Sequence, residues 1–220
     1  MKKTFTIFIF ILLAAVAAAA QTYSRAKLWD AEINELTAID RKQTPPADAV
    51  LFVGSSSIRM WTNLRESFPR LPVINRGFGG SRLADVVYYF DRIVTPYAPK
   101  AIVLYAGDND INDGIAPEKV LEDYRAFAAL VRAKLPKARL FYIALKPSPS
   151  RWKLAEPMRR ANELIKAEIA GRKRAKFVDV WSAMLDALGE PRPELFLDDK
   201  LHMNEQGYQI WRDILTPLLR

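Results

Sequence analysis

Five short apolar runs alternate with longer segments of helical periodicity, and this alternation limits the fold more than any other feature. The runs are Ala49–Val53, Pro72–Asn75, Ala101–Tyr105, Leu140–Leu145 and Phe177–Val180. They are apolar along most of their length, as strands buried on both faces are. Alternating β and α segments place such strands in a parallel sheet with helices on both faces. We therefore predict an α/β fold: a three-layer α/β/α sandwich with a central parallel five-stranded sheet.

The segments between these runs carry the spacing of amphipathic helices. Expected helices are Ser24–Arg41, a helix starting at Ile58, Ala84–Ile93, Pro117–Leu135, Trp152–Ala170 and Asn204–Leu219. Proline suits the first turn of the fourth helix, and Asn204 is a good N-cap for the last one. We find no linker and no internal repeat, so residues 21–220 are predicted to form a single domain.

The first twenty residues have a different character from the rest of the chain. Lys2 and Lys3 precede an almost unbroken apolar run, Phe5–Ala20, that ends in four alanines. This pattern predicts a secretory signal peptide over residues 1–20, and hence a periplasmic or secreted protein. An uncleaved anchor helix is the alternative, because the run falls just short of the ~20 residues that span a bilayer. No second run of that length follows, so we expect no stable membrane insertion after cleavage.

Charge and cysteine content exclude several classes of function. The chain has a formal net charge of +8 and no cysteine. Cysteine catalysis and thiolate metal sites are therefore impossible. The densest basic cluster, Arg172–Arg174, follows a glycine and precedes a strand, as a solvated loop would. No basic stripe interleaved with aromatic residues is present, so we predict no nucleic-acid partner.

Polar or glycine-rich clusters stand where the predicted strands end. They are Ser55-Ser56-Ser57, Gly77-Phe78-Gly79-Gly80, Gly107-Asp108-Asn109-Asp110 and, before the last helix, Asp198-Asp199-Lys200-Leu201-His202. Ligands of open α/β sheets bind beyond the carboxyl ends of the strands. Each cluster alone is compatible with a helix cap or a turn, but all four are expected at the same edge of the sheet.

Together the clusters contain every part that a serine hydrolase needs. Such an enzyme requires a hydroxyl, a base, a group that orients the base, and donors for the oxyanion. His202 is the only histidine and therefore the candidate base. Asp199, three residues earlier, can accept the Nδ1 proton and is preferred over Asp198 on spacing. The candidate donors are the backbone N–H groups of Ser56 and Gly80 and the side-chain amide of Asn109.

Rival motifs are incomplete. Arg82 stands where a dinucleotide fingerprint requires glycine, and no Gly-Lys-Ser/Thr of a P-loop is present. A calcium-like start at Asp108 lacks the glycine at position six, which is Asp113, and the glutamate at position twelve, which is Lys119. A single histidine disfavours a histidine–carboxylate metal site. The sequence therefore predicts no cofactor and no metal.

The four clusters resemble the blocks of the SGNH, or GDSL, hydrolases. Ser56 stands at the position of the nucleophile, Gly80 and Asn109 at those of the oxyanion donors, and Asp199-Lys200-Leu201-His202 matches the Asp-x-x-His block. The resemblance spans residues 50–219 and implies a flavodoxin-like fold with metal-free esterase, lipase or acetylesterase activity. One position departs from the family pattern: Ser55 replaces the usual aspartate before the nucleophile.

These observations predict an exported serine esterase acting on short-chain acyl or O-acetyl esters, including those of saccharides. The loop Lys146–Trp152 is expected to overhang the site, with Arg151 or Trp152 facing a sugar or an anionic group, or with Trp152 in the core. A catalytically inactive carbohydrate-binding module and a lysophospholipase- or thioesterase-type lipid hydrolase remain as alternatives. The sequence gives no indication of the oligomeric state.

Overall fold

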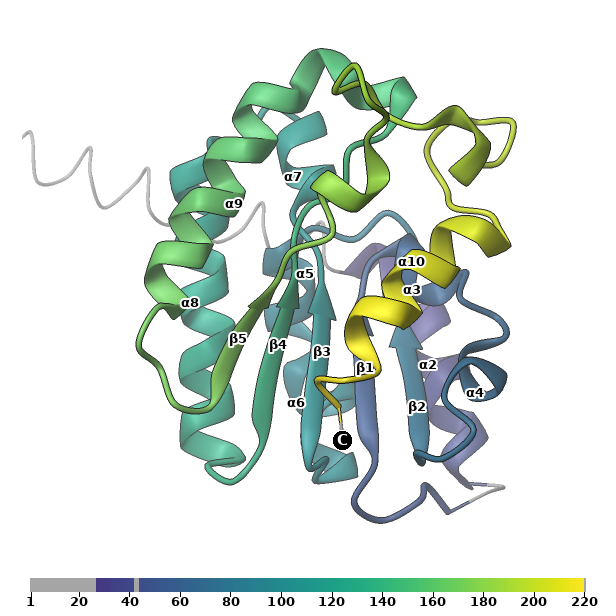
Figure 1. The fold of residues 1–220 in the computed structure, drawn as a ribbon. Coiled ribbons are helices and arrows are strands. Elements are labelled where there is room, and N and C mark those ends of the chain that lie inside the picture. The colour runs from purple at the N-terminus through teal and green to yellow at the C-terminus, as the bar shows by residue number, and fades with distance from the viewer. Residues whose placement is uncertain (1–26, 42–43, 220) are drawn as a thin grey trace, which may run out of the picture.

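The computed structural model describes residues 27–41 and 44–219. Five parallel strands form one sheet in the order β2-β1-β3-β4-β5 (Figure 1). The strands are β1 Val50–Gly54, β2 Val73–Gly77, β3 Ala101–Tyr105, β4 Arg139–Ile143 and β5 Ala175–Val178. This is the doubly wound order of flavodoxin-like folds. The predicted three-layer α/β/α sandwich with a parallel five-stranded sheet is confirmed.

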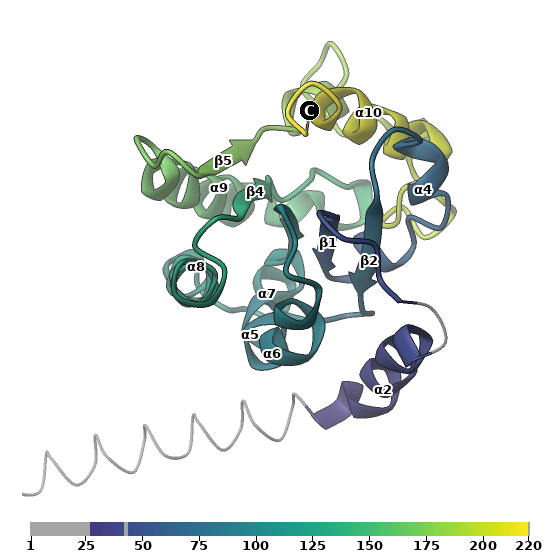
Figure 2. The same ribbon diagram turned by 90° about the horizontal axis from the view of Figure 1, so that it is seen from below.

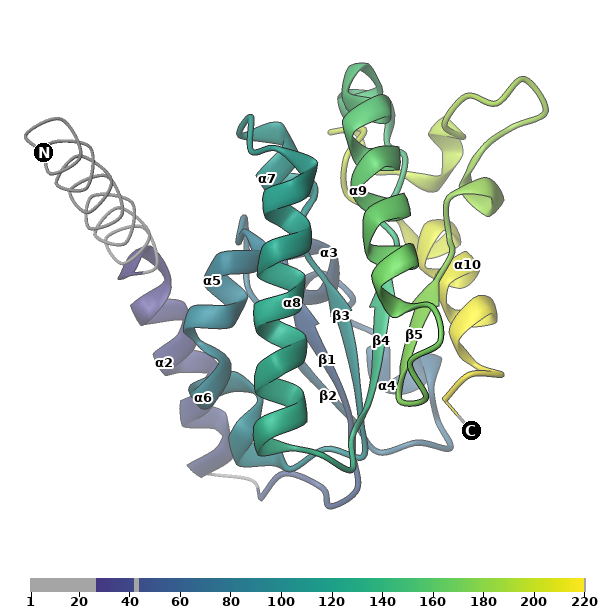
Figure 3. The same ribbon diagram turned by 90° about the vertical axis from the view of Figure 1, so that its left-hand side faces the viewer.

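Helices cover both faces of the sheet, as seen from below in Figure 2 and from the side in Figure 3. One face carries α2 Asp30–Ala38, α5 Leu83–Tyr88, α6 Phe90–Ile93, α8 Pro117–Lys134 and α9 Ala155–Ile169. The other carries α3 Ser56–Arg59, α4 Leu64–Ser67 and α10 Glu205–Leu215. A further short helix, α7 Asp108–Asn112, follows β3 at the carboxyl edge of the sheet.

Alternating residues of the inner strand β1 belong to two separate apolar cores. Leu51 and Val53 belong to the core under α2, α5, α6, α8 and α9, whereas Val50 and Phe52 belong to the core under α3, α4 and α10. Every residue of β1 is buried. Burial on both faces explains why the strands are apolar throughout instead of alternating.

Several predicted helices differ in their boundaries. The expected helix Ala84–Ile93 consists of two short helices, α5 and α6, and the helix expected from Ile58 begins at Ser56 and ends at Arg59. The expected Trp152–Ala170 helix begins as a 3-10 helix, Pro149–Leu154, before α9. The last helix ends at Leu215, and the described part of Ser24–Arg41 is α2 flanked by two 3-10 turns.

The N-terminal predictions fall largely outside what the structure describes. The predicted signal peptide, residues 1–20, lies outside the described residues, and the assignment of residues 21–220 to one domain stays a prediction. Within residues 27–41 and 44–219, no helix combines the length and the apolar character needed to cross a membrane.

The turn after β1 requires a glycine. Gly54 has a φ of +139°, and a Cβ there would lie 1.9 Å from the carbonyl oxygen of Tyr105. This close approach lets the next residue, Ser55, donate its backbone N–H to the same carbonyl at 2.9 Å. The chain then turns directly into α3, which places Ser56 at the carboxyl edge of the sheet.

Candidate active site

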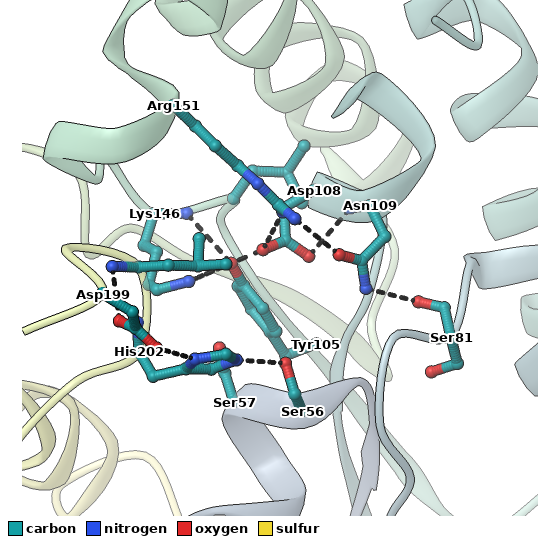
Figure 4. Close-up of polar contacts among 12 residues, drawn as sticks. Ser56, Ser57, Ser81, Tyr105, Asp108, Asn109, Lys146, Arg151, Asp199 and His202 are labelled. Atoms are coloured by element: carbon teal, nitrogen blue, oxygen red, sulfur yellow. Dashed lines mark hydrogen bonds and ion pairs between the residues drawn. The ribbon is translucent and has the colours of Figure 1, made fainter. Parts of the chain in front are cut away.

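Ser56 and His202 meet at the carboxyl edge of the sheet. Ser56 is the first residue of α3, and its Oγ lies 2.9 Å from Nε2 of His202 (Figure 4). The neighbouring serines are more deeply buried: Ser55 is 0% and Ser57 1% exposed. Ser56 is therefore the serine of this turn whose hydroxyl faces the imidazole.

Asp199 holds the other side of the imidazole ring. Its Oδ2 lies 2.5 Å from Nδ1 of His202, and its Oδ1 accepts the backbone N–H groups of Leu201 and His202 at 2.9 and 2.8 Å. Partial burial alone would raise the pKa of the Asp199 carboxyl, but these hydrogen bonds lower it to about 2. An ionised Asp199 favours the tautomer with the proton on Nδ1, which leaves Nε2 free to accept from Ser56. Asp198 is exposed.

Gly80 has a backbone conformation that suits glycine. Its φ is +68°, and a Cβ there would meet nothing within 4 Å, so the conformation and not the space favours glycine. The preceding residue, Gly79, makes hydrogen bonds to residues of α2 and of the 3-10 turn before α2. The N–H of Gly79 donates to Glu32 at 3.2 Å, and its carbonyl accepts from the indole nitrogen of Trp29.

Asn109 lies in α7 and is held at both ends of its amide. Its Nδ2 donates to the carbonyl oxygen of Ser81 at 2.9 Å, and its Oδ1 accepts from Nη2 of Arg151 at 2.9 Å (Figure 4). Asn109 is 9% exposed. The structure thus fixes the direction of this amide through a residue, Arg151, to which the sequence assigned a different role.

Arg151 belongs to a buried group of charges beside the site. Its Nη1 donates to Oδ2 of Asp108 at 3.0 Å, and Nζ of Lys146 lies 3.5 Å from the same oxygen. Burial alone would raise the pKa of Asp108, but the two cations lower it below its usual value. Burial lowers the pKa of Lys146, against the opposing effect of Asp108. The only indication of this group in the sequence was Lys146, which directly follows the apolar run Leu140–Leu145.

The predicted overhanging loop contacts the histidine loop. The N–H of Ser150 donates to the carbonyl of Lys200 at 3.1 Å. Arg151, which was expected to face a sugar or an anionic group, turns inward to Asp108 and Asn109. Trp152 is half-buried beside Trp181, with 6.1 Å between the ring centroids, and belongs to neither apolar core.

The calcium-like acidic residues point to different partners. Asp108 pairs with Lys146 and Arg151, whereas Asp110 accepts the backbone N–H of Leu83 at 3.1 Å. Burial raises the pKa of Asp110 to about 7. In the part of the chain that the structure describes, no three histidine, cysteine or acidic side chains gather as metal ligands would.

The sequence matches a family model and curated proteins. Residues 47–210 match the model of the GDSL-like Lipase/Acylhydrolase family. The platelet-activating factor acetylhydrolase IB subunit alpha1 of Bos taurus is 30% identical over 188 residues, which cover 82% of this chain and 78% of that protein. Its human counterpart is also 30% identical, over 82% of this chain and 79% of that protein.

Solved structures share the fold at lower sequence identity. A Streptococcus pneumonia protein whose name refers to platelet activating factor has a TM-score of 0.78 and 20% identity, over 93% of this chain and 99% of the other. A mutant of an acetyl-xylooligosaccharide esterase from Geobacillus has a TM-score of 0.64 and 15% identity, over 80% of this chain and 96% of the other. These likenesses concern the fold.

Proposed function

The chain belongs to the GDSL-like lipase/acylhydrolase family, and from that premise we propose that it is an exported serine esterase that hydrolyses carboxylic esters. The observation that carries the proposal is the chain of contacts from Ser56 through His202 to Asp199. A hydroxyl becomes a useful nucleophile at neutral pH when a base lies within hydrogen-bond reach, and the base is effective when a third group orients it.

The proposed reaction has two steps. Oγ of Ser56 attacks the acyl carbon while Nε2 of His202 takes its proton, and Asp199 stabilises the imidazolium that forms. The negative charge on the former carbonyl oxygen is bound by the N–H groups of Ser56 and Gly80 and by Nδ2 of Asn109. The tetrahedral intermediate then expels the alcohol, which receives the proton from His202. Water, activated by the same histidine, hydrolyses the acyl-enzyme and releases the acid.

An acetyl group is the acyl group we propose. The matched bovine relative is named for an acetylhydrolase and the matched Geobacillus structure for an acetyl-xylooligosaccharide esterase, so the names of both similar proteins refer to an acetyl group. The alcohol we propose is a saccharide, since an exported enzyme meets acetylated glycans outside the cytoplasm. A lysophospholipase or thioesterase activity is the alternative that the same site would allow.

Hydrolysis by the purified protein tests the reaction class. We expect p-nitrophenyl acetate and acetylated xylooligosaccharides to be cleaved, and p-nitrophenyl octanoate to be cleaved more slowly. Ser56→Ala should abolish turnover and labelling by a fluorophosphonate. Ser57→Ala is the matched control, because the Oγ of this buried neighbour has no hydrogen-bond partner, and the variant should remain active.

Two results would overturn the proposal. Folded Ser56→Ala protein that hydrolyses esters at the wild-type rate would exclude Ser56 as the nucleophile. Folded wild-type protein that binds a glycan, turns over no ester and resists the fluorophosphonate would instead identify an inactive carbohydrate-binding module.

Export is proposed on the sequence of residues 1–20 alone. Two lysines followed by Phe5–Ala20 and the alanines at its end support a cleaved signal peptide. Cell fractionation followed by N-terminal sequencing checks it. A mature N-terminus near Gln21 in an exported fraction is expected, whereas an intact N-terminus in the membrane fraction would identify an anchor.

A further inference from the structure

Three charged side chains are buried together beside Asn109. The exposed fractions of the Lys146, Asp108 and Arg151 side chains are 1%, 6% and 11%. Two cations share one carboxylate oxygen, so the group carries a net positive charge (Figure 4). Burying charges costs free energy that mutual attraction often only offsets. Stability alone therefore does not account for placing such a group here.

The geometry connects this charge group to one particular atom. The two terminal nitrogens of Arg151 have different acceptors: Nη1 donates to Asp108 at 3.0 Å and Nη2 donates to Oδ1 of Asn109 at 2.9 Å. A guanidinium is rigid and planar, so a hydrogen bond at one terminal nitrogen restricts the position of the other. Asp108, backed by Lys146, therefore fixes where Arg151 meets the asparagine amide.

The contacts of Asn109 permit one direction of its amide. In the observed direction, Oδ1 faces the guanidinium and Nδ2 faces the carbonyl of Ser81. A rotated amide would set its NH2 group against Arg151 and its oxygen against the Ser81 carbonyl, and both contacts would be repulsive. The NH2 group carries two hydrogens. One is used by Ser81, and the other is directed away from it.

We propose that Arg151 is a positioning residue for ester hydrolysis, which acts by holding the Asn109 amide with its nitrogen toward the developing oxyanion. The inference rests on the proposed function, because it assigns Arg151 to the oxyanion site of that reaction. A cation on Oδ1 also polarises the amide, which makes the remaining N–H a stronger donor. The benefit appears only when charge develops on the substrate oxygen, so it should act on kcat and leave KM little changed.

A double-mutant cycle tests the inference. Arg151→Lys keeps the charge near Asp108 but cannot bridge two acceptors as the fork does. We expect it to lower kcat on p-nitrophenyl acetate by roughly 10- to 100-fold with KM unchanged, as misplacement of one oxyanion donor would. In an Asn109→Ala background, the same substitution should cost less than about 2-fold, because the group on which it acts is gone. Arg160→Lys, an exposed arginine in the adjacent helix, is the matched control and should leave kcat unchanged.

Other results would overturn the inference. Equal losses from Arg151→Lys in the wild-type and Asn109→Ala backgrounds would show that Arg151 acts elsewhere. A loss confined to KM would identify a substrate contact, and an unchanged kcat would remove the role altogether. If Arg151→Lys does not fold, Asp108→Asn replaces it in the cycle, because it releases the same fork. We expect the loss of kcat caused by Asp108→Asn also to vanish in the Asn109→Ala background. Losses from Asp108→Asn and Asn109→Ala that simply add would contradict the inference.

The wild-type baseline separates this inference from the proposed function. Hydrolysis that Ser56→Ala does not abolish would overturn the proposed function, and the inference with it. Hydrolysis that depends on Ser56 while Arg151→Lys has no effect would leave the proposed function standing and overturn the inference alone.

Discussion

The indole nitrogen of Trp29 donates a hydrogen bond to the carbonyl oxygen of Gly79, fifty residues further along the chain. This carbonyl belongs to the peptide group whose N–H is that of Gly80. The described chain has no cis peptide bond, and in a trans peptide the C=O and N–H bonds point in opposite directions. Trp29 therefore sets the plane of the peptide that we propose as an oxyanion donor.

Replacing this indole should slow catalysis. Trp29→Phe keeps an aromatic ring against Phe78, whose ring centroid lies 5.8 Å away, but removes the N–H donor. A net hydrogen bond is worth about 0.5–1.5 kcal/mol, so we expect kcat to fall by about 2- to 12-fold with a small change in KM. Trp181→Phe is the control, because that indole packs against Trp152 and the guanidinium of Arg159. A lowered melting temperature with an unchanged kcat would show that Trp29 serves only the fold.

The low pKa of Asp199 predicts a simple acid limb in the pH–rate profile. With a pKa of about 2, the carboxylate stays ionised above pH 4, so Asp199 should add no ionisation of its own to the acid side of the kcat/KM profile. Steady-state rates from pH 4 to 9 check this. An acid limb of the kcat/KM profile whose slope corresponds to two ionisations would contradict this prediction.

Removing the charge of Asp199 should be severe. Asp199→Asn preserves the shape but favours the wrong imidazole tautomer, and we expect kcat to fall on the order of 10⁴-fold. The adjacent, exposed Asp198 provides the matched comparison, and Asp198→Asn should retain activity. Similar losses in the two variants would remove the distinction between these aspartates.

Asp110 should make the protein less stable as the pH rises. Its pKa is raised by burial to about 7 in the folded state from an ordinary value of 3.8. Its favourable contribution is therefore complete below about pH 4 and is lost as the pH rises through about 7. Asp110→Asn keeps an acceptor for the N–H of Leu83 but does not ionise. The variant should gain stability relative to wild type between pH 4 and pH 8, by at most about 4 kcal/mol. Urea unfolding at both pH values measures this, and a pH-independent difference would contradict it.

The N-cap of α10 should contribute to stability. The side chain of Asn204 accepts the N–H groups of Gln206 and Gly207 at 3.0 and 3.2 Å and donates to the carbonyl of Glu194 at 2.8 Å. Asn204→Ala should lower the free energy of unfolding by about 1–2 kcal/mol, whereas Asn204→Ser should recover part of the loss, since serine is also a good cap. An alanine variant as stable as wild type would show that the cap is dispensable.

The strands were predictable because burial on both faces leaves short apolar runs, and their length and the polar or glycine-rich segments after them favour strands over helices. The largest error was at β5, predicted as Phe177–Val180 and found at Ala175–Val178. This edge strand pairs only with β4, and its Lys176 is exposed, so its apolar pattern is weaker. Helix boundaries were less accurate, since α5 and α6 share one continuous apolar periodicity although the chain bends between them.

The sequence predicted contacts within the site only for residues that belong to a recognisable motif. Ser56, Asp199 and His202 were placed by their clusters and by the family resemblance, and the structure brings them together. Arg151 and Trp29 were not assigned these contacts, because each lies in another part of the sequence and reaches the site through one long side chain. Sequence spacing carries no record of such tertiary contacts.

The hydrogen bond between Ser56 and His202 joins residues 146 positions apart. A ribosome therefore makes the serine long before the histidine. Until residue 202 has been made, the emerging chain carries the Ser56 hydroxyl without the imidazole that it contacts in the structure, and contacts between residues so far apart in sequence form slowly. Premature termination anywhere before the Asp199–His202 turn would therefore leave Ser56 without the base that we propose for it.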